Sequence, residues 1–172
     1  MQKIARLLIA TAVIAGAAWA WIALHPAPER VIRNRLAKLA AIASIQPGEN
    51  EITRGYHALA ILDYFTQDAV LSLNPWRADG GTLSGKEDLR NMSTAASRLA
   101  SLKIQFFDVT VTLAPDRQSA TVNLVAAVTL PSDRDPAPQP LLIKMRKVQG
   151  QWLISEVTAL KVLGAVTLAP AA

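Results

Sequence analysis

The chain has 172 residues, of which 51% are hydrophobic, and this length suits one domain with its own core. It has no cysteine and two histidines, which excludes disulfides, thiol catalysis and thiolate zinc sites, and leaves too few histidines for a metal site with several of them as ligands. The formal net charge is +5, but no basic stripe alternates with aromatic residues, so no nucleic-acid partner is expected. No metal or cofactor is expected either.

Residues 1–28 are predicted to be a signal anchor followed by a linker. Residues 7–24 form an almost unbroken apolar run, and a span of the bilayer takes about 20 such residues. Trp19 and Trp21 lie at the far end of the run, where interfacial aromatic residues gather. A cleaved signal peptide is the alternative. We favour the anchor because the run exceeds the usual h-region of about 7–15 residues.

The orientation of the anchor follows from the charges on its two sides. Lys3 and Arg6 precede the apolar run, and a short charged lead of this kind opens many export signals. Four basic residues follow it and favour the opposite orientation by the positive-inside rule: Arg30, Arg33, Arg35 and Lys38. We expect the amino terminus inside and the domain on the periplasmic or outer side of a bacterial inner membrane, or secreted if the leader is cleaved.

Three helices are predicted after the leader. Residues 29–45 carry an apolar stripe, with a basic opposite side that is most simply a solvated face. The stripe consists of Ile32, Leu36, Leu39 and Ala43. Residues 51–66 follow a cap at Asn50 and are apolar nearly all round, so this helix is expected to be mostly buried. A third helix, about residues 85–100, begins at the capping-box pattern of residues 84–87.

The strands are expected as one short segment, residues 69–73, and four longer ones in a meander. The long segments are residues 102–113, 120–130, 141–148 and 151–163. In the first of them the inward phase changes between Phe106 and Phe107, which predicts a β-bulge because one extra residue reverses the facing. Residues 164–172 are expected to form a loosely held tail.

Three short motifs occur in an order that is typical of one superfamily. They are residues 64–70 (YFTQDAV) at a helix-to-strand corner, residues 85–89 (GKEDL) opening a helix, and residues 151–154 (QWLI) opening the last strand. The chain thereby resembles, over about residues 30–163, the nuclear transport factor 2-like superfamily, which includes ketosteroid isomerase and the SnoaL-like polyketide cyclases. The resemblance implies an α+β cone for residues 29–163, in which three helices pack on a strongly curved antiparallel sheet around a pocket.

The pocket candidates are Tyr56, Asp63, Trp76 and Glu156. The isomerases of the resembled superfamily use an inward aspartate as base and a tyrosine as oxyanion donor, but no motif matches Tyr56 or Asp63 to those positions. These two residues are also separated by about 10 Å of helical rise, which is too far for direct contact. Asp108, beside the predicted bulge, is expected to point outward, and Trp76 to cover the core from a loop.

Whether the Glu156 side chain points into the pocket or outward depends on the phase of the last strand. Unbroken alternation from Trp152 and Ile154 would turn Glu156 inward, where an unpaired carboxylate costs several kcal/mol. A bulge near Ser155 would instead turn Val157 inward and Glu156 outward, and we favour it.

The expected function is a membrane-anchored, non-catalytic domain that binds a small apolar ligand or a partner protein. The resemblance implies that two copies could pair through the open face of the sheet, and that the layout can serve assembly, as in inner-membrane subunits of type IV secretion. The alternative is an isomerase, cyclase or dehydratase that uses an inward carboxylate in the cone. An inward acid paired with a polar group would favour the enzyme, and an apolar pocket would favour binding alone.

Overall fold

The computed structural model describes residues 27–73, 81–130 and 138–161. The predicted anchor (residues 7–24), the loop candidate Trp76 and the predicted tail (residues 164–172) lie outside these ranges, so what was expected of them stays a prediction. Within the described ranges, no helix combines the length and the apolar character that a bilayer span requires.

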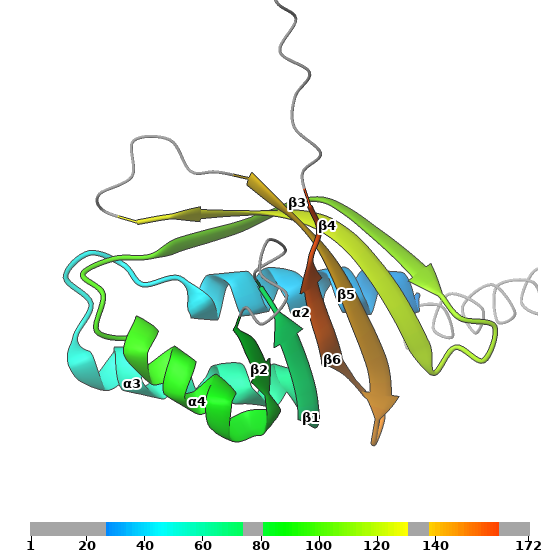
Figure 1. Ribbon diagram of the computed structural model, residues 1–172, viewed down its shortest axis with the longest axis horizontal. Coiled ribbons are helices and arrows are strands. Elements are labelled where there is room, and N and C mark those ends of the chain that lie inside the picture. Colours follow the sequence, from blue (N-terminus) through cyan, green and yellow to red (C-terminus); the bar gives the residue numbers. More distant parts are fainter. Residues whose placement is uncertain (1–26, 74–80, 131–137, 162–172) are drawn as a thin grey trace, which may run out of the picture.

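Three α-helices and a short 3-10 helix pack on one six-stranded sheet (Figure 1). The helices are α2 (Pro28–Ala43), α3 (Glu51–Ala60), η1 (Ile61–Tyr64) and α4 (Gly85–Ala96). The strands are β1 (Phe65–Ser72), β2 (Thr82–Ser84), β3 (Lys103–Leu113), β4 (Ser119–Thr129), β5 (Pro138–Val148) and β6 (Gln151–Ala159). Their order across the sheet is β2-β1-β6-β5-β4-β3, so β3 is an edge strand.

The sheet is mixed, which corrects the expectation of a wholly antiparallel one. β3, β4, β5 and β6 form the predicted antiparallel meander, but β1 runs parallel to β6 and pairs Val70 with Glu156. β1 is also longer than predicted, because Phe65 pairs with Ile154 and the preceding helix ends earlier. β2 is a three-residue strand that the sequence pattern did not indicate.

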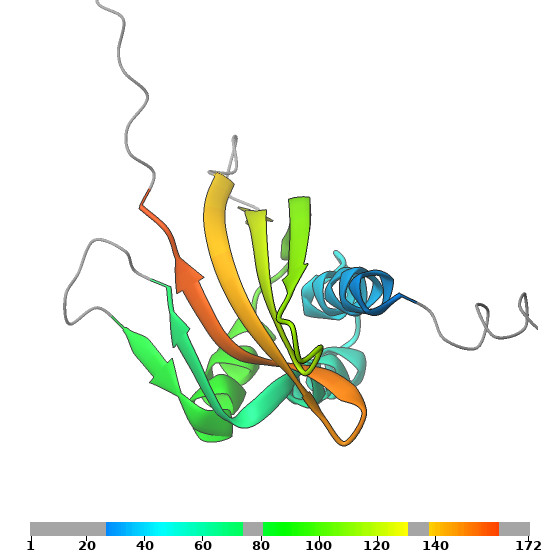
Figure 2. The ribbon, with the colours of Figure 1, turned by 90° about the vertical axis from the view of Figure 1, so that its right-hand side faces the viewer.

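One core fills the space between the helices and the inward face of the bent sheet (Figure 2). α2 contributes Ile32, Leu36 and Leu39, as predicted, together with Ala40, whereas Ala43 of the predicted stripe is only half-buried. The long strands contribute alternate residues, among them Val122 on β4 and Met145 on β5. The alternation works because successive strand side chains point to opposite faces, so one phase of each strand meets the helices.

Both predicted bulges occur. β6 places Glu156 opposite Lys144 and Ile154 opposite Met145, which leaves Ser155 as the extra residue. In β3 the register shifts between Phe107 and Thr110 rather than before Phe107, so Phe107, predicted to begin the inward phase, faces outward. The residue that absorbs this second shift is Asp108, whose φ of 52° lies in the left-handed region.

α3 is exposed on a side that was expected to be buried. Ile52, Tyr56 and Leu59 form one stripe and are 86%, 72% and 57% exposed. The opposite side of α3 contributes Ala58 to the buried residues of the domain. The apolar pattern therefore identified a helix and its two faces, but no described element covers the outer one.

The ends of the elements follow local chemistry. Asn50 caps α3 as predicted, since its side-chain oxygen accepts a hydrogen bond from the Thr53 N–H at 2.7 Å. The side chain of Ser84 makes no cap bond to α4, and its N–H instead donates to Asp88 at 2.9 Å. Residues 149–150 join β5 to β6 with two positive φ angles, as a tight hairpin turn requires.

Candidate functional site

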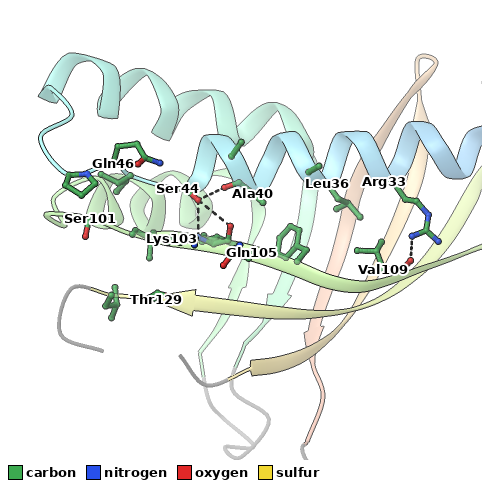
Figure 3. Close-up of a pocket in the computed structure, with 18 residues that line it drawn as sticks. Arg33, Leu36, Ala40, Ser44, Gln46, Ser101, Lys103, Gln105, Val109 and Thr129 are labelled. Carbon is green, nitrogen blue, oxygen red and sulfur yellow. Dashed lines mark hydrogen bonds between the residues drawn. The ribbon is translucent and has the colours of Figure 1, made fainter. Parts of the chain in front are cut away.

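The candidate site is a groove of about 850 Å³ between the C-terminal half of α2 and the edge strand β3 (Figure 3). Small side chains on this side of α2 leave the space open: Ala37, Ala40, Ala41 and Ser44 all border it. A larger side chain at these helical positions would fill the space between α2 and β3.

The groove is mostly apolar. Leu36 and Ile45 line it from the α2 side, and Leu102, Ile104, Phe106 and Val109 line it from the strand side. The polar lining residues are Arg33, Ser44, Gln46, Ser101, Lys103, Gln105 and Thr129. Because Ile104 and Lys103 belong to opposite faces of β3, the groove follows the rim of the sheet rather than the centre of the cone. The centre is filled by side chains such as Ile154, which is 1% exposed.

Hydrogen bonds fix the two walls relative to each other. The Ser44 hydroxyl accepts a bond from the Ile104 N–H at 3.0 Å and donates to the Ala40 carbonyl at 2.7 Å. Ile45 and Leu102 exchange two backbone bonds, of 2.7 and 3.0 Å. At the other end, Arg33 donates to the carbonyl oxygen of Val109, next to the bulge (Figure 3). These contacts occupy part of an otherwise unpaired strand edge and hold the groove open.

The charges of the groove are of one sign. Its charged lining residues are Arg33 and Lys103, and the described part of its lining contains no aspartate, glutamate, histidine or tyrosine. General acid–base chemistry needs such a group within about 3 Å of the reacting atoms. The described lining can therefore surround an apolar body and attract a negative end, but it holds no carboxylate or imidazole to move a proton.

None of the described pocket candidates lines this groove. Tyr56 projects from the exposed stripe of α3, and Asp63 is an exposed residue of η1 whose backbone oxygen accepts a bond from Arg35. Trp76 lies outside the described residues. Asp108 is exposed at its bulge, as expected. The described candidates therefore lie on α3, η1 and β6, outside this groove, and Trp76 stays a prediction.

Glu156 lies on the outward face of the sheet, so the bulged alternative holds. Its carboxylate accepts a bond from the Lys144 ammonium at 2.8 Å and a longer one from the Thr158 hydroxyl at 3.3 Å. The hydrogen bond from Lys144 holds the pKa of the Glu156 carboxyl below its usual range, against the opposing effect of partial burial. With 37% of its side chain exposed, Glu156 is a solvated ion-pair residue.

Sequence reasoning missed the residues that do form the groove. The sequence pattern places Arg33 on a solvated basic face and gives no individual signal for Ser44 or Lys103. One signal was present: residues 37, 40, 41 and 44 are small and share one side of the first helix. That spacing indicates a helix side without bulk, but not which element faces it. Among the described residues, no three metal-ligating side chains cluster either.

Comparison with known proteins identifies the fold. No protein-family model and no curated protein matches the chain. An NTF2-like (nuclear transport factor 2-like) protein with a cystatin-like fold from Novosphingobium aromaticivorans superposes with a TM-score of 0.60 at 13% identity, covering 80% of this chain and 83% of that one. A domain of unknown function with a cystatin-like fold from Nostoc punctiforme gives 0.60 at 17% identity, covering 81% and 80%.

A third similar structure carries the name of an enzyme. It is a protein named after scytalone dehydratase, also from Novosphingobium aromaticivorans, with a TM-score of 0.57 at 12% identity and coverage of 76% and 80%. The chain therefore has the nuclear transport factor 2-like fold that its motifs predicted. At these identities the likeness concerns the fold alone, and since the fold serves both enzymes and proteins without known activity, function must be argued from the groove.

Proposed function

We propose that this chain is a membrane-anchored, extracytoplasmic domain that binds a small apolar ligand with a negatively charged end, without catalysis, in the groove between α2 and β3. The observation that carries the proposal is the composition of the groove, in which an apolar lining is combined with Arg33 and Lys103 as its charged residues. A volume of about 850 Å³ also lies within the range of small-molecule sites, about 300–1,000 Å³.

The ligand class follows from the positions of these side chains. The apolar wall, with the partly exposed Ile104, Phe106 and Val109, favours a hydrocarbon chain or ring, because burying such surface releases about 25 cal/mol per Å². Arg33 already donates to a backbone oxygen and keeps further N–H groups for an anion. A medium-chain carboxylic acid has both features.

The enzyme alternative has little support in the groove. It required an inward carboxylate, and neither Asp63 nor Glu156 borders the groove. The membrane anchor rests on the apolar run of residues 7–24 and its charged lead, as the sequence predicts.

Photocrosslinking tests the ligand site. The full chain, reconstituted in lipid nanodiscs, is exposed to a medium-chain fatty acid that carries a diazirine, and mass spectrometry locates the adducts. We expect adducts on residues 37–45 and 102–109. Ala41→Trp, which fills the groove from an exposed position on α2, should abolish them, whereas Ala95→Trp, at an exposed position on α4, should not. Adducts elsewhere, or adducts indifferent to Ala41→Trp, would refute the groove as the site.

We also propose that two copies associate through the outward face of the sheet. Phe107, Val125 and Pro140 lie side by side on this face, because each is the register partner of the next. Phe107 is 47% exposed. Leu142 extends the apolar area on β5, next to Asn123. A partner surface of the same kind would cover these side chains.

A further inference from the structure

We propose that α2 carries a second site, separate from the groove, which binds the phosphate group of a phosphate ester. The site is a surface pocket of about 380 Å³ beside η1. Its lining residues are Arg30, Val31, Asn34, Arg35, Lys38 and Tyr64. Three of these six are cations, Asn34 adds a neutral amide, and Val31 and Tyr64 form an apolar wall. No carboxylate borders it within the described residues.

Arg35 gives this pocket a fixed cation. One of its terminal nitrogens donates to the Asp63 carbonyl oxygen at 2.7 Å, and its guanidinium carbon lies 4.7 Å from the centre of the Tyr64 ring. A guanidinium held over an aromatic ring loses little freedom when it binds an anion, and its planar array of donors suits phosphate oxygens. Arg35 is therefore organised before the ligand arrives.

The positive charge of α2 is not balanced within the described part of the chain. α2 contains four basic residues and one acidic residue, Glu29. The ion pairs found among the described residues involve His57, Lys144 and Arg146, and none of them includes a residue of α2. Arg30 and Lys38 are exposed and project beside Arg35 into the same pocket. An anion from outside this part of the chain fits the site.

The place of α2 in the chain favours a lipid headgroup as the source of the phosphate, and this step alone rests on the proposed anchor. The apolar run ends at Leu24 and α2 begins at Pro28. Four Cα steps span about 14 Å when extended, so an anchored α2 begins at the level of the headgroups. A soluble phosphate ester offers the same chemistry, and the experiment separates the two sources.

The test uses the absence of native cysteine in the full chain. Ala27→Cys, at an exposed position just before α2 that does not line the pocket, is labelled with an environment-sensitive fluorophore. The protein is reconstituted in vesicles of phosphatidylcholine, whose phosphate is balanced by its own choline cation, or of phosphatidylcholine mixed with anionic phosphatidylglycerol. If the phosphate comes from lipid, phosphatidylglycerol should shift the emission to the blue. About 1 M NaCl, at which the Debye length is about 3 Å, should reverse the shift. If it comes from a soluble ester, millimolar inorganic phosphate should change the emission in phosphatidylcholine alone.

The variants decide whether the cations of α2 are responsible. In Arg30→Gln/Lys38→Gln, the ratio of blue-shifted to unshifted label in the phosphatidylglycerol vesicles should fall roughly 30-fold. The reason is that each basic side chain near an anionic surface contributes about a factor of five to binding. Arg90→Gln/Arg98→Gln, which removes two exposed cations on or just after α4, should respond like the parent. The proposal is overturned if neither lipid nor phosphate changes the emission, or if both double variants respond equally. None of these variants alters a residue of the groove. The fluorescence result can therefore be interpreted even if the crosslinking experiment shows that the groove binds no ligand.

Discussion

One extra residue in each of two strands decides where two carboxylates of this domain point. Ser155 is the extra residue of β6; it turns Val157 into the core and leaves Glu156 in water beside Lys144. Asp108 is the extra residue of β3; it adopts a positive φ, and its own side chain stays exposed. Keeping the carboxylates outside avoids a cost of several kcal/mol for each unpaired buried charge. The two bulges thus account for the outward positions of Asp108 and Glu156.

The left-handed backbone conformation of Asp108 can be tested by substitution at this position. Glycine adopts this region without strain, whereas a β-branched residue does so poorly. We expect Asp108→Gly to leave the free energy of unfolding unchanged or to raise it by up to about 1 kcal/mol, and Asp108→Val to lower it by about 1–2 kcal/mol. Urea unfolding of the full chain in detergent, followed by tryptophan fluorescence, measures both. Equal effects of the two substitutions would contradict the bulge conformation.

The ion pair of Glu156 predicts a pH dependence of known sign. The hydrogen bond from Lys144 lowers the pKa of this carboxyl in the folded state below its ordinary value of 4.5. A lowered pKa stabilises the fold above about pH 4.5, and the contribution disappears as pH falls through the folded-state pKa. Glu156→Gln should therefore be less stable than the parent at pH 7, by at most about 1 kcal/mol because the pair is partly exposed.

The difference between the parent and Glu156→Gln should shrink as the pH is lowered from 7 to below 4.5, as measured by urea midpoints across that range. Lys144→Met provides the matched control, since it removes the same bond from the other side. A difference that persists or grows at low pH would show that Glu156 stabilises the fold by another means.

Among the elements, α2 and α3 show what an apolar stripe does and does not predict. Both carry the helical spacing, yet α2 buries Leu36 while α3 exposes Ile52. The difference lies outside each helix: α2 lies along the sheet, whereas the outer side of α3 meets no described element. Periodicity identifies which side chains share a face, but the packing of other elements decides whether that face is covered.

Paired substitutions on these two helices should differ strongly. Leu36→Ala removes a side chain that is 1% exposed and should lower the free energy of unfolding by about 2–5 kcal/mol. Ile52→Ala removes one that is 86% exposed and should change it by less than about 0.5 kcal/mol. Chemical denaturation of both variants in the same detergent gives the comparison. A large loss from Ile52→Ala would mean that an undescribed segment or a second copy covers α3.

The elements that could be predicted from sequence are those whose signal is local. The stripe of α2, the Asn50 cap, the two bulges and the residue 149–150 turn each depend on neighbours within a few positions. The parallel pairing of β1 with β6 could not be predicted, because it depends on where the chain returns after a long separation. The groove could not be placed either: Ala40 and Ser44 show that a helix side is small, but only the fold places β3 opposite them.

At the scale of the whole molecule, the proposed anchor predicts that the full-length chain behaves as an integral membrane protein. Full-length chain in isolated membranes should stay in the pellet after a carbonate wash at high pH, which strips peripheral proteins but leaves spanning segments in place. Deletion of residues 1–24 should release the domain to the supernatant. Release of the uncut chain by carbonate would refute the anchor, while a shortened chain in the soluble fraction would indicate a cleaved leader.

The proposed pairing of two copies depends on one half of the outward face. The other half carries the ion pairs Lys144–Glu156 and Arg146–Asp68, which are satisfied within one chain. The apolar half, around Val125, has no such partner among the described residues and is the part that a second copy could cover. An interface of ordinary size buries about 800 Å² per partner, so the contact must also include the flanking strands.

A charge placed in the centre of this apolar half should separate the copies. Val125→Arg would bury a guanidinium against its symmetry mate, and like charges brought together across an interface cost several kcal/mol. We expect the full chain in detergent to sediment as a dimer and Val125→Arg to sediment as a monomer with unchanged circular dichroism. Thr121→Arg, near the charged half of the same face, is the control and should stay dimeric. A parent chain that is monomeric at every concentration would refute the pairing.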